Sequence, residues 1–329
     1  MIKRILNRSK DYLFALPGFE RMWINQLKGK VSCLLYHRVE AYGKHDFLDR
    51  GGSPVISEAD FDREISYLKK LPTQFYTLAD LNKGKFPDKD TIGIVICFDD
   101  CFKCNYDQGL CILERHGIHA VFFQCTGFIN SSFLNWEHLL YWLYRNPATK
   151  SALLERLKNT VRQEEINAES IHYLRENIDS KLIEIQTLVI AREFGFAADI
   201  ENLASQLYPD EKIIINAFNL GHEIASHGHG HYKRDTISDE IFELDLKQSY
   251  AVLYELLGQK PISYSYPFNS YSSKDHKRAR QFFTTIANVE FGRINQPVNN
   301  SSDLIPRLTW PGVSSNQYRM KRWLLTGKF

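Results

Sequence analysis

The chain has 329 residues, a formal net charge of +2, 43% hydrophobic residues and 24% charged residues. These values are typical of a soluble globular protein that forms one large domain or two ordinary ones. The small net charge gives no evidence for a nucleic-acid partner. No apolar run approaches the roughly 18–20 residues that a helix needs to span a bilayer.

Residues 1–30 form a basic N-terminal segment that begins Met1-Ile2-Lys3-Arg4 and is interrupted by Asp11 and Glu20. The segment lacks a continuous apolar stretch and a small-residue cleavage site, so it does not have the pattern of a secretory signal. We therefore expect a cytoplasmic protein in which residues 1–30 are a packed helical segment. The alternative is a basic amphipathic helix that contacts the inner face of a membrane peripherally.

From residue 31 onwards, predicted strands alternate with predicted helices. Apolar and β-branched runs predict strands at 31–39, 75–78, 93–98 and 119–126. A cap signal at Ser57 begins one helix, and another covers about 105–116 and ends at Gly117. This order predicts parallel strands joined by crossover helices.

From about residue 136 to residue 217 the apolar residues recur with a helical period and many charges lie between them. We expect an all-helical insertion here, a candidate lid, within a barrel domain that covers residues 31–329. Strands return at 221–226, 262–266 and 282–289, and a helix from Ser238 is predicted to stop at Gly258.

All six cysteines lie before residue 126. Disulfide frameworks usually belong to small secreted domains, so we expect free thiols. Cys97, Cys101 and Cys104 nevertheless have the C-x3-C-x2-C spacing of radical enzymes that bind an iron–sulfur cluster and use S-adenosylmethionine. Two acids inside the loop and Lys103 beside the last cysteine fit a cluster-binding loop poorly.

The strand predicted at 93–98 is followed directly by two acids, Asp99 and Asp100. Carboxylates at such a sheet edge occupy the place where α/β enzymes carry out their chemistry. Further along the chain, His227 and His231 stand four residues apart, so they can converge on one metal that a carboxylate also binds. Consecutive side chains of an extended segment diverge, so one acid can hold a metal while the other faces a substrate. The pattern predicts a hydrolytic metal centre.

Four segments, in this order, resemble motifs of the polysaccharide deacetylase (NodB-homology) family. Leu35–Val39 resembles the Y-H-x-V strand that opens the exopolysaccharide branch, and Cys97–Cys101 resembles T-F-D-D-G. Glu223–His231 resembles E-I-G-S-H-x-x-x-H, and Tyr264–Asn269 resembles F-A-Y-P-Y-G. The resemblance covers about residues 31–313 apart from the helical insertion. It implies an α/β fold, a distorted and incomplete (β/α) barrel, with a metal site at the C-terminal ends of its strands.

The resemblance also implies a role for each matching residue. One divalent metal, with Zn²⁺ the expected ion, would be bound by Asp100, His227 and His231, and Asp99 would be the catalytic base. In much of the family a late histidine is the general acid, but no histidine follows His276 in this chain.

In the exopolysaccharide branch the histidine of the first strand takes the acid role, which predicts His37 as the residue that protonates the departing amine. A nearby anion such as Asp99 is expected to raise its pKa and keep it charged. The backbone N–H of Phe268 is a candidate for the oxyanion hole, and Tyr266 is a candidate substrate contact.

Three residues depart from the family pattern. Cys101 replaces the glycine after the acid pair, Gly228 replaces a Ser or Thr after the first metal histidine, and Ser265 stands where many members have an arginine beside the base. Arg307, in Ile305-Pro306-Arg307, is the candidate replacement for that arginine and resembles a P-R segment of the same branch.

The predicted function is a metal-dependent hydrolase that removes the N-acetyl group from an amino sugar of a cell-surface polysaccharide or of its lipid-linked precursor. The three departures keep a second hypothesis open, a catalytically silent glycan-binding protein on the same fold. The radical enzyme is the third. Acetate release with added metal would separate the first two hypotheses.

Overall fold

The computed structural model describes residues 17–49, 53–161, 170–295, 298, 304–309 and 323. Its centre is a ring of parallel strands, β1 (Val31–Tyr36), β5 (Ile92–Phe98), β6 (Val121–Gln124), β7 (Glu223–Ser226), β8 (Ser263–Ser265), β9 (Thr285–Val289) and β10 (Ile305–Thr309). The strands pair in the order β1-β10-β9-β8-β7-β6-β5, and β5 pairs with β1 to close the ring. The predicted (β/α) barrel is therefore confirmed. Among the described residues it has seven strands, which is one fewer than a complete eight-stranded barrel.

Three short strands lie outside the ring. Strand β4 (Thr73–Phe75) pairs with the first half of β5, on the edge where β6 pairs with the second half. Strands β2 (Arg38–Val39) and β3 (Val55–Ile56) form a separate pair directly after β1. The run predicted as one strand at 31–39 is thus two strands that separate at His37.

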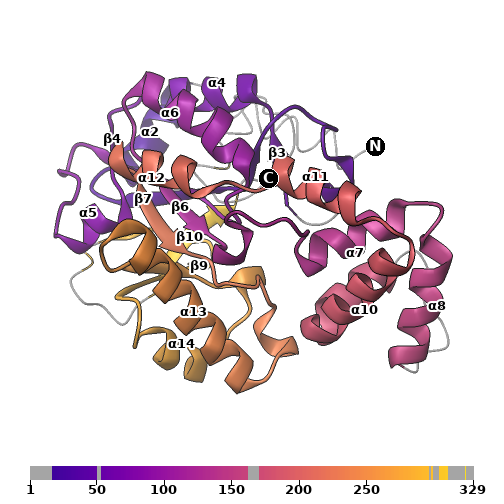
Figure 1. The fold of residues 1–329 in the computed structure, drawn as a ribbon. Helices are drawn as coiled ribbons and strands as arrows, with labels where there is room; N and C mark the ends of the chain where they lie inside the picture. Colours follow the sequence, from indigo (N-terminus) through magenta and orange to yellow (C-terminus); the bar gives the residue numbers. More distant parts are fainter. Residues whose placement is uncertain are drawn as a thin grey trace.

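Helices cover the outside of the barrel (Figure 1). They are α2 (Pro17–Leu27), α4 (Glu58–Leu68), α5 (Leu78–Asn82), the π-helical η1 (Asn105–Leu110), α6 (Cys111–His116), α13 (Asp239–Leu257) and α14 (Ser273–Ala279). The short helix α3 (Asp46–Asp49) instead packs against the helix at Trp136–Arg145. The short 3₁₀ turns are η2 (Thr126–Phe128), η3 (Arg234–Thr236) and η4 (Pro267–Asn269).

Local signals set several helix ends. The Ser57 and Ser238 side chains cap α4 and α13, and Gly117 and Gly258 adopt the left-handed conformation that ends α6 and α13.

Between β6 and β7 the described residues form six α-helices, α7 (Trp136–Arg145), α8 (Lys150–Val161), α9 (Ser170–Asn177), α10 (Ser180–Glu193), α11 (Ala197–Leu207) and α12 (Glu211–Asn219). Helices α7, α8 and α10 pack together at one side of the molecule, to the right in Figure 1. Helix α12 instead packs against β7 and α13, as a crossover helix of the barrel does.

The first half of the N-terminal segment, on which the proposed membrane contact depends, lies outside the described residues. Within the part of the chain that the structure describes, no helix combines the length and apolar character needed to cross a membrane.

Alternating side chains of each strand face opposite sides of the barrel wall. On β5, Ile94 and Ile96 pack in the outer core with the helices, whereas Val95 and Cys97 pack in the inner core. The inner core also contains Val31, Cys33 and Leu35 of β1 and Ala225 of β7. The next inward-facing residue along each chain segment, just beyond the end of its strand, lies at the mouth of the barrel.

Candidate active site

Three of the predicted site residues are the first inward-facing residues beyond the ends of their strands. His37 continues Cys33 and Leu35, Asp99 continues Val95 and Cys97, and His227 follows Ala225 at the same spacing. Parallel strands end at the same face of a barrel, so this spacing brings residues far apart in sequence together. They line one pocket of about 280 Å³, together with Asp100, Glu137, Arg175, His231, Tyr266 and Phe268.

Asp100 turns away from the strand direction. It has φ of 62°, and Cys101 after it has φ of 56°, so two consecutive residues other than glycine are left-handed. Such a conformation costs roughly 1–2 kcal/mol per residue and persists where the surroundings enforce it. The family's glycine is absent, but the backbone at Cys101 adopts the conformation that a glycine would favour.

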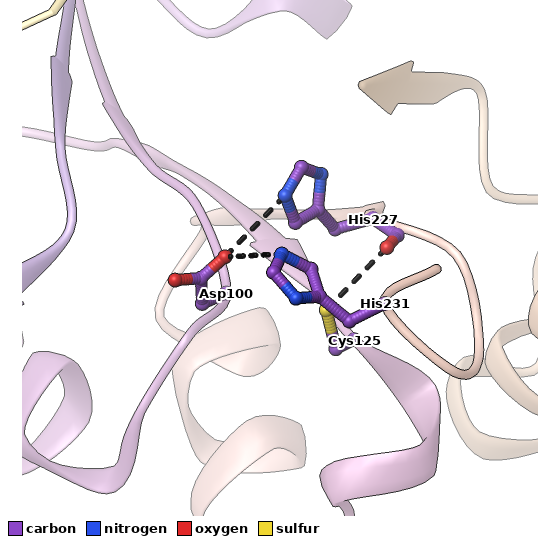
Figure 2. Close-up of side chains that lie close together, drawn as sticks. All are labelled: Asp100, Cys125, His227 and His231. Carbon is purple, nitrogen blue, oxygen red and sulfur yellow. Dashed lines mark hydrogen bonds and ion pairs between the residues drawn. The ribbon is translucent and has the colours of Figure 1, made fainter. Parts of the chain in front are cut away.

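Three donor atoms converge at the base of the pocket. Asp100 Oδ1 lies 3.1 Å from His231 Nε2 and 3.4 Å from His227 Nε2 (Figure 2). Burial raises the pKa of Asp100, but His231 and hydrogen bonds to both histidines bring it well below its usual value. A buried carboxylate with two imidazole nitrogens is a donor set that suits Zn²⁺ and other divalent transition ions.

A second polar group lies on the far side of each of these three side chains. Ser53 Oγ donates to Asp100 Oδ2 at 3.1 Å, and His227 Nδ1 lies 2.9 Å from the Ser265 carbonyl oxygen. His231 Nδ1 lies 3.2 Å from Glu137 Oε2. Burial lowers the pKa of His231, but Asp100 and Glu137 raise it to about 10. All three side chains are thus oriented with one atom free to face a common ion.

Cys125 is the fourth group near these atoms. Its Sγ lies 3.4 Å from the His227 carbonyl oxygen and donates to it, as Figure 2 shows. Burial, with the negative charge of Asp100, raises the pKa of this thiol well above its ordinary value. The sulfur thus points to a backbone carbonyl, whereas the donor atoms of Asp100, His227 and His231 face one another.

The cysteines of the C-x3-C-x2-C spacing do not converge. Cys97 packs in the inner core, Cys101 in the outer core, and Cys104 in the core of the helices α7–α11. All six cysteines are free thiols, as predicted, and only Cys111 is exposed. The geometry therefore gives no support to an iron–sulfur cluster at these three residues.

Asp99 is paired with Arg307 inside the barrel mouth. Arg307 Nη1 donates to Asp99 Oδ1 at 2.5 Å, and Nη2 donates to Oδ2 at 2.9 Å. Arg307 is 1% exposed, and its guanidinium lies over the ring of Phe123 at 4.7 Å. Burial raises the pKa of Asp99, but Arg307 and His227 lower it below the ordinary value. Arg307 thus occupies the place beside the acid that Ser265 leaves open.

His37 lines the same pocket with a half-buried side chain whose Nδ1 has no hydrogen-bond partner. Asn105 Nδ2 donates to its backbone carbonyl at 2.5 Å, which fixes the chain where β1 ends. The expectation of a raised pKa is wrong. Burial lowers the pKa of His37, and this effect outweighs the negative charges of Asp100 and Asp99.

Phe268 and Tyr266 also line the pocket. Phe268 has φ of 56°, and its ring centroid lies 4.8 Å from that of His231. The Tyr266 ring stacks on that of Tyr271, with the ring centroids 4.6 Å apart. The predicted oxyanion role of Phe268 and the substrate contact of Tyr266 remain predictions.

The folded structure, unlike the sequence, explains why position 228 is a glycine. Its φ is 76°, and a Cβ added there would lie 2.6 Å from Asp245 Oδ2. The Asp245 carboxylate accepts from the backbone N–H groups of His229 at 3.0 Å and Gly230 at 2.7 Å. A buried acid therefore organises the loop between His227 and His231, and a side chain at position 228 would displace it.

Four residues that contact the predicted site or its loop were not found from the sequence: Ser53, Glu137, Arg175 and Asp245. Ser53 stands in a polar loop, and Arg38 Nε donates to its carbonyl oxygen at 3.2 Å. Asp245 is a buried acid in the middle of α13. None of these positions has a distinctive local pattern, because each meets its partner only in the folded chain.

The polysaccharide deacetylase family model matches residues 87–286, which is more than half of the chain. The chain belongs to the polysaccharide deacetylase family. No curated protein matches it in sequence.

Several solved structures share the fold of this deacetylase-family chain. IcaB from Ammonifex degensii matches with a TM-score of 0.57 and 15% identity over 91% of this chain and 98% of that chain. Streptococcus pyogenes deacetylase PplD, solved in complex with acetate, matches with a TM-score of 0.56 and 14% identity over 89% and 98%. A de-N-acetylase from Aggregatibacter actinomycetemcomitans matches with a TM-score of 0.54 and 14% identity over 88% and 98%.

Proposed function

We propose that this polysaccharide deacetylase family member is a metal-dependent N-deacetylase that acts on an N-acetylated amino sugar of a cell-surface polysaccharide or its lipid-linked precursor. The observation that carries the proposal is the different environment of two adjacent acids. Asp100 faces two histidine nitrogens, whereas Asp99 is bound by Arg307 in the same pocket. Amide hydrolysis with a metal needs this division between a ligand and a proton acceptor.

Asp100, His227 and His231 would hold the ion, most simply Zn²⁺. A divalent ion bound there would polarise the acetyl carbonyl and acidify the attacking water. The rest of the chemistry belongs to the side chains. Asp99, kept ionised by Arg307, accepts the proton of the water, and Arg307 fixes both carboxylate oxygens so that the acid cannot rotate away.

His37 supplies a proton to the departing amine. Its lowered pKa reduces the protonated fraction at neutral pH, but the protonated form is then a stronger donor. The Phe268 N–H would support the carbonyl oxygen as negative charge develops on it. The pocket is open enough to admit an acetamido group with part of its sugar ring, and Tyr266 lies at its wall.

The test is acetate release from a panel of N-acetylated oligosaccharides by protein stripped with a chelator and then reloaded with Zn²⁺. Reloaded wild type should release acetate, and stripped protein should not. Asp99→Asn should keep the metal and lose on the order of 100-fold or more in turnover. Oligosaccharide binding without acetate release by the reloaded protein would favour the silent glycan-binding alternative.

A further inference from the structure

Helix α7 presents a buried carboxylate to the far side of one proposed metal ligand. Glu137 is the second residue of α7 and is 3% exposed. Its Oε2 lies 3.2 Å from His231 Nδ1, while Nε2 of the same ring faces Asp100. The His231 ring therefore lies between a carboxylate of the barrel and a carboxylate of the helical segment.

The start of α7 also holds the backbone that carries His231. Asn135 caps α7 by accepting from the Glu137 N–H at 3.1 Å, and its Nδ2 donates to the Gly230 carbonyl at 2.9 Å. Trp136 Nε1 donates to the His231 carbonyl at 3.1 Å. His231 has φ of 53°, a conformation that a residue other than glycine keeps only when its surroundings hold it. Three consecutive residues of this helix start thus bind the His231 loop.

Arg175 of α9 fixes Glu137 in turn. Its Nη1 donates to Glu137 Oε1 at 3.0 Å, its Nε donates to Glu176 Oε1 at 2.9 Å, and its guanidinium lies 5.2 Å from the Phe268 ring centroid. Glu137 therefore uses one oxygen for Arg175 and keeps the other for His231. Because two carboxylates already bind Arg175, its role is to position Glu137 and not to bind an anionic substrate.

We propose that the helices between β6 and β7 complete the metal centre, with Glu137 as the positioning residue for His231 and Arg175 as the positioning residue for Glu137. This inference rests on the proposed function, since it requires that the site bind a metal. A carboxylate 3.2 Å from Nδ1 would favour the proton on that nitrogen and so leave the Nε2 lone pair for the ion. The helical segment is then part of the catalytic apparatus, in addition to lying beside the pocket.

The test is Zn²⁺ affinity, measured by competition with a chromophoric chelator, for wild type, Glu137→Gln, Glu137→Asp, Glu137→Ala and Arg175→Met. Losing such a partner weakens metal binding by about 10- to 100-fold. We expect the largest loss for Glu137→Ala, a smaller one for the nearly isosteric Glu137→Gln, and partial recovery for Glu137→Asp. Arg145→Gln is the matched control, because Arg145 lies on the same helix but pairs with Asp46 at the surface.

A double variant separates positioning from a merely structural role. In a Glu137→Ala background, Arg175→Met should cause no further loss of Zn²⁺ affinity, because Arg175 acts on the site through Glu137. A further loss of the same size, or unchanged affinity in Glu137→Ala and Glu137→Gln, would overturn this inference alone. If wild type binds no Zn²⁺, the proposed function fails and this inference fails with it.

Discussion

Removal of Arg307 should leave a buried charge without its partner. Asp99 and Arg307 are both almost fully buried and share two hydrogen bonds, of 2.5 and 2.9 Å. Opposite charges about 4 Å apart attract by about 4 kcal/mol at an effective dielectric constant near 20. Breaking such a pair by removing one partner typically destabilises a protein by about 3–5 kcal/mol. We expect Arg307→Met to reduce the free energy of unfolding by this amount at neutral pH.

The loss of unfolding free energy in Arg307→Met should depend on pH. In wild type the folded pKa of Asp99 is lowered, so the group stabilises the fold above its unfolded pKa of about 3.9. That stabilisation is lost as the pH falls through the lowered folded value. Without Arg307, burial dominates and the folded pKa rises above the unfolded one. The difference in unfolding free energy between wild type and Arg307→Met should therefore become smaller as the pH is lowered from about 8 to about 5.

The assay is urea unfolding followed by circular dichroism, on Arg307→Met, Asp99→Asn and the double variant. The double variant should be more stable than Arg307→Met, because it removes both charges. Arg38→Met is the control, since it breaks another buried pair, with Glu40 at 2.6 Å. Adding Asp99→Asn to Arg38→Met should not restore any of the stability that Arg38→Met loses. Additive losses in the Asp99–Arg307 cycle, or a stability loss of Arg307→Met that does not change with pH, would show that Arg307 does not stabilise ionised Asp99.

Variants of His37 and Ser53, and labelling of the cysteines, test the pocket and the thiols. His37→Gln should lower amide turnover by about 100-fold or more but have much less effect on an activated acetyl ester, whose leaving group needs no proton; equal loss on both substrates, or loss of metal, would exclude His37 as the acid. Ser53→Ala removes the 3.1 Å hydrogen bond to Asp100 and should weaken Zn²⁺ binding about tenfold; an unchanged dissociation constant would contradict this. A thiol reagent should label Cys111 alone in the native protein and all six cysteines after denaturation; a denatured count near zero would indicate disulfides.

Features with a local cause could be predicted from the sequence. The Ser238 cap and Gly258 set both ends of α13, and the run of apolar residues before Asp99 identified β5. Strand β10 was missed because its five residues include Pro306 and Arg307 and form no apolar run. It nevertheless closes the ring against β1.

The remaining site residues could not be predicted because their environment exists only in the fold. Glu137 and Ser53 look like ordinary polar residues in the sequence, and only the fold brings α7 and the segment just before β3 to the strand ends. Gly228 departs from the family pattern because Asp245, on a later helix, occupies the space of a side chain. The expected rise in the pKa of His37 considered the nearby acids but not the burial that outweighs them.

Elemental analysis after loading with Zn²⁺ and gel filtration can decide whether one divalent metal is bound by Asp100, His227 and His231. Wild type should contain about one zinc per chain. His231→Ala should contain almost none. Cys125→Ser is the control, because its sulfur lies near the ligand atoms but donates to a backbone carbonyl, and it should keep its zinc. Equal zinc content in wild type and His231→Ala, or loss of zinc in Cys125→Ser, would contradict the ligand set and with it the proposed mechanism.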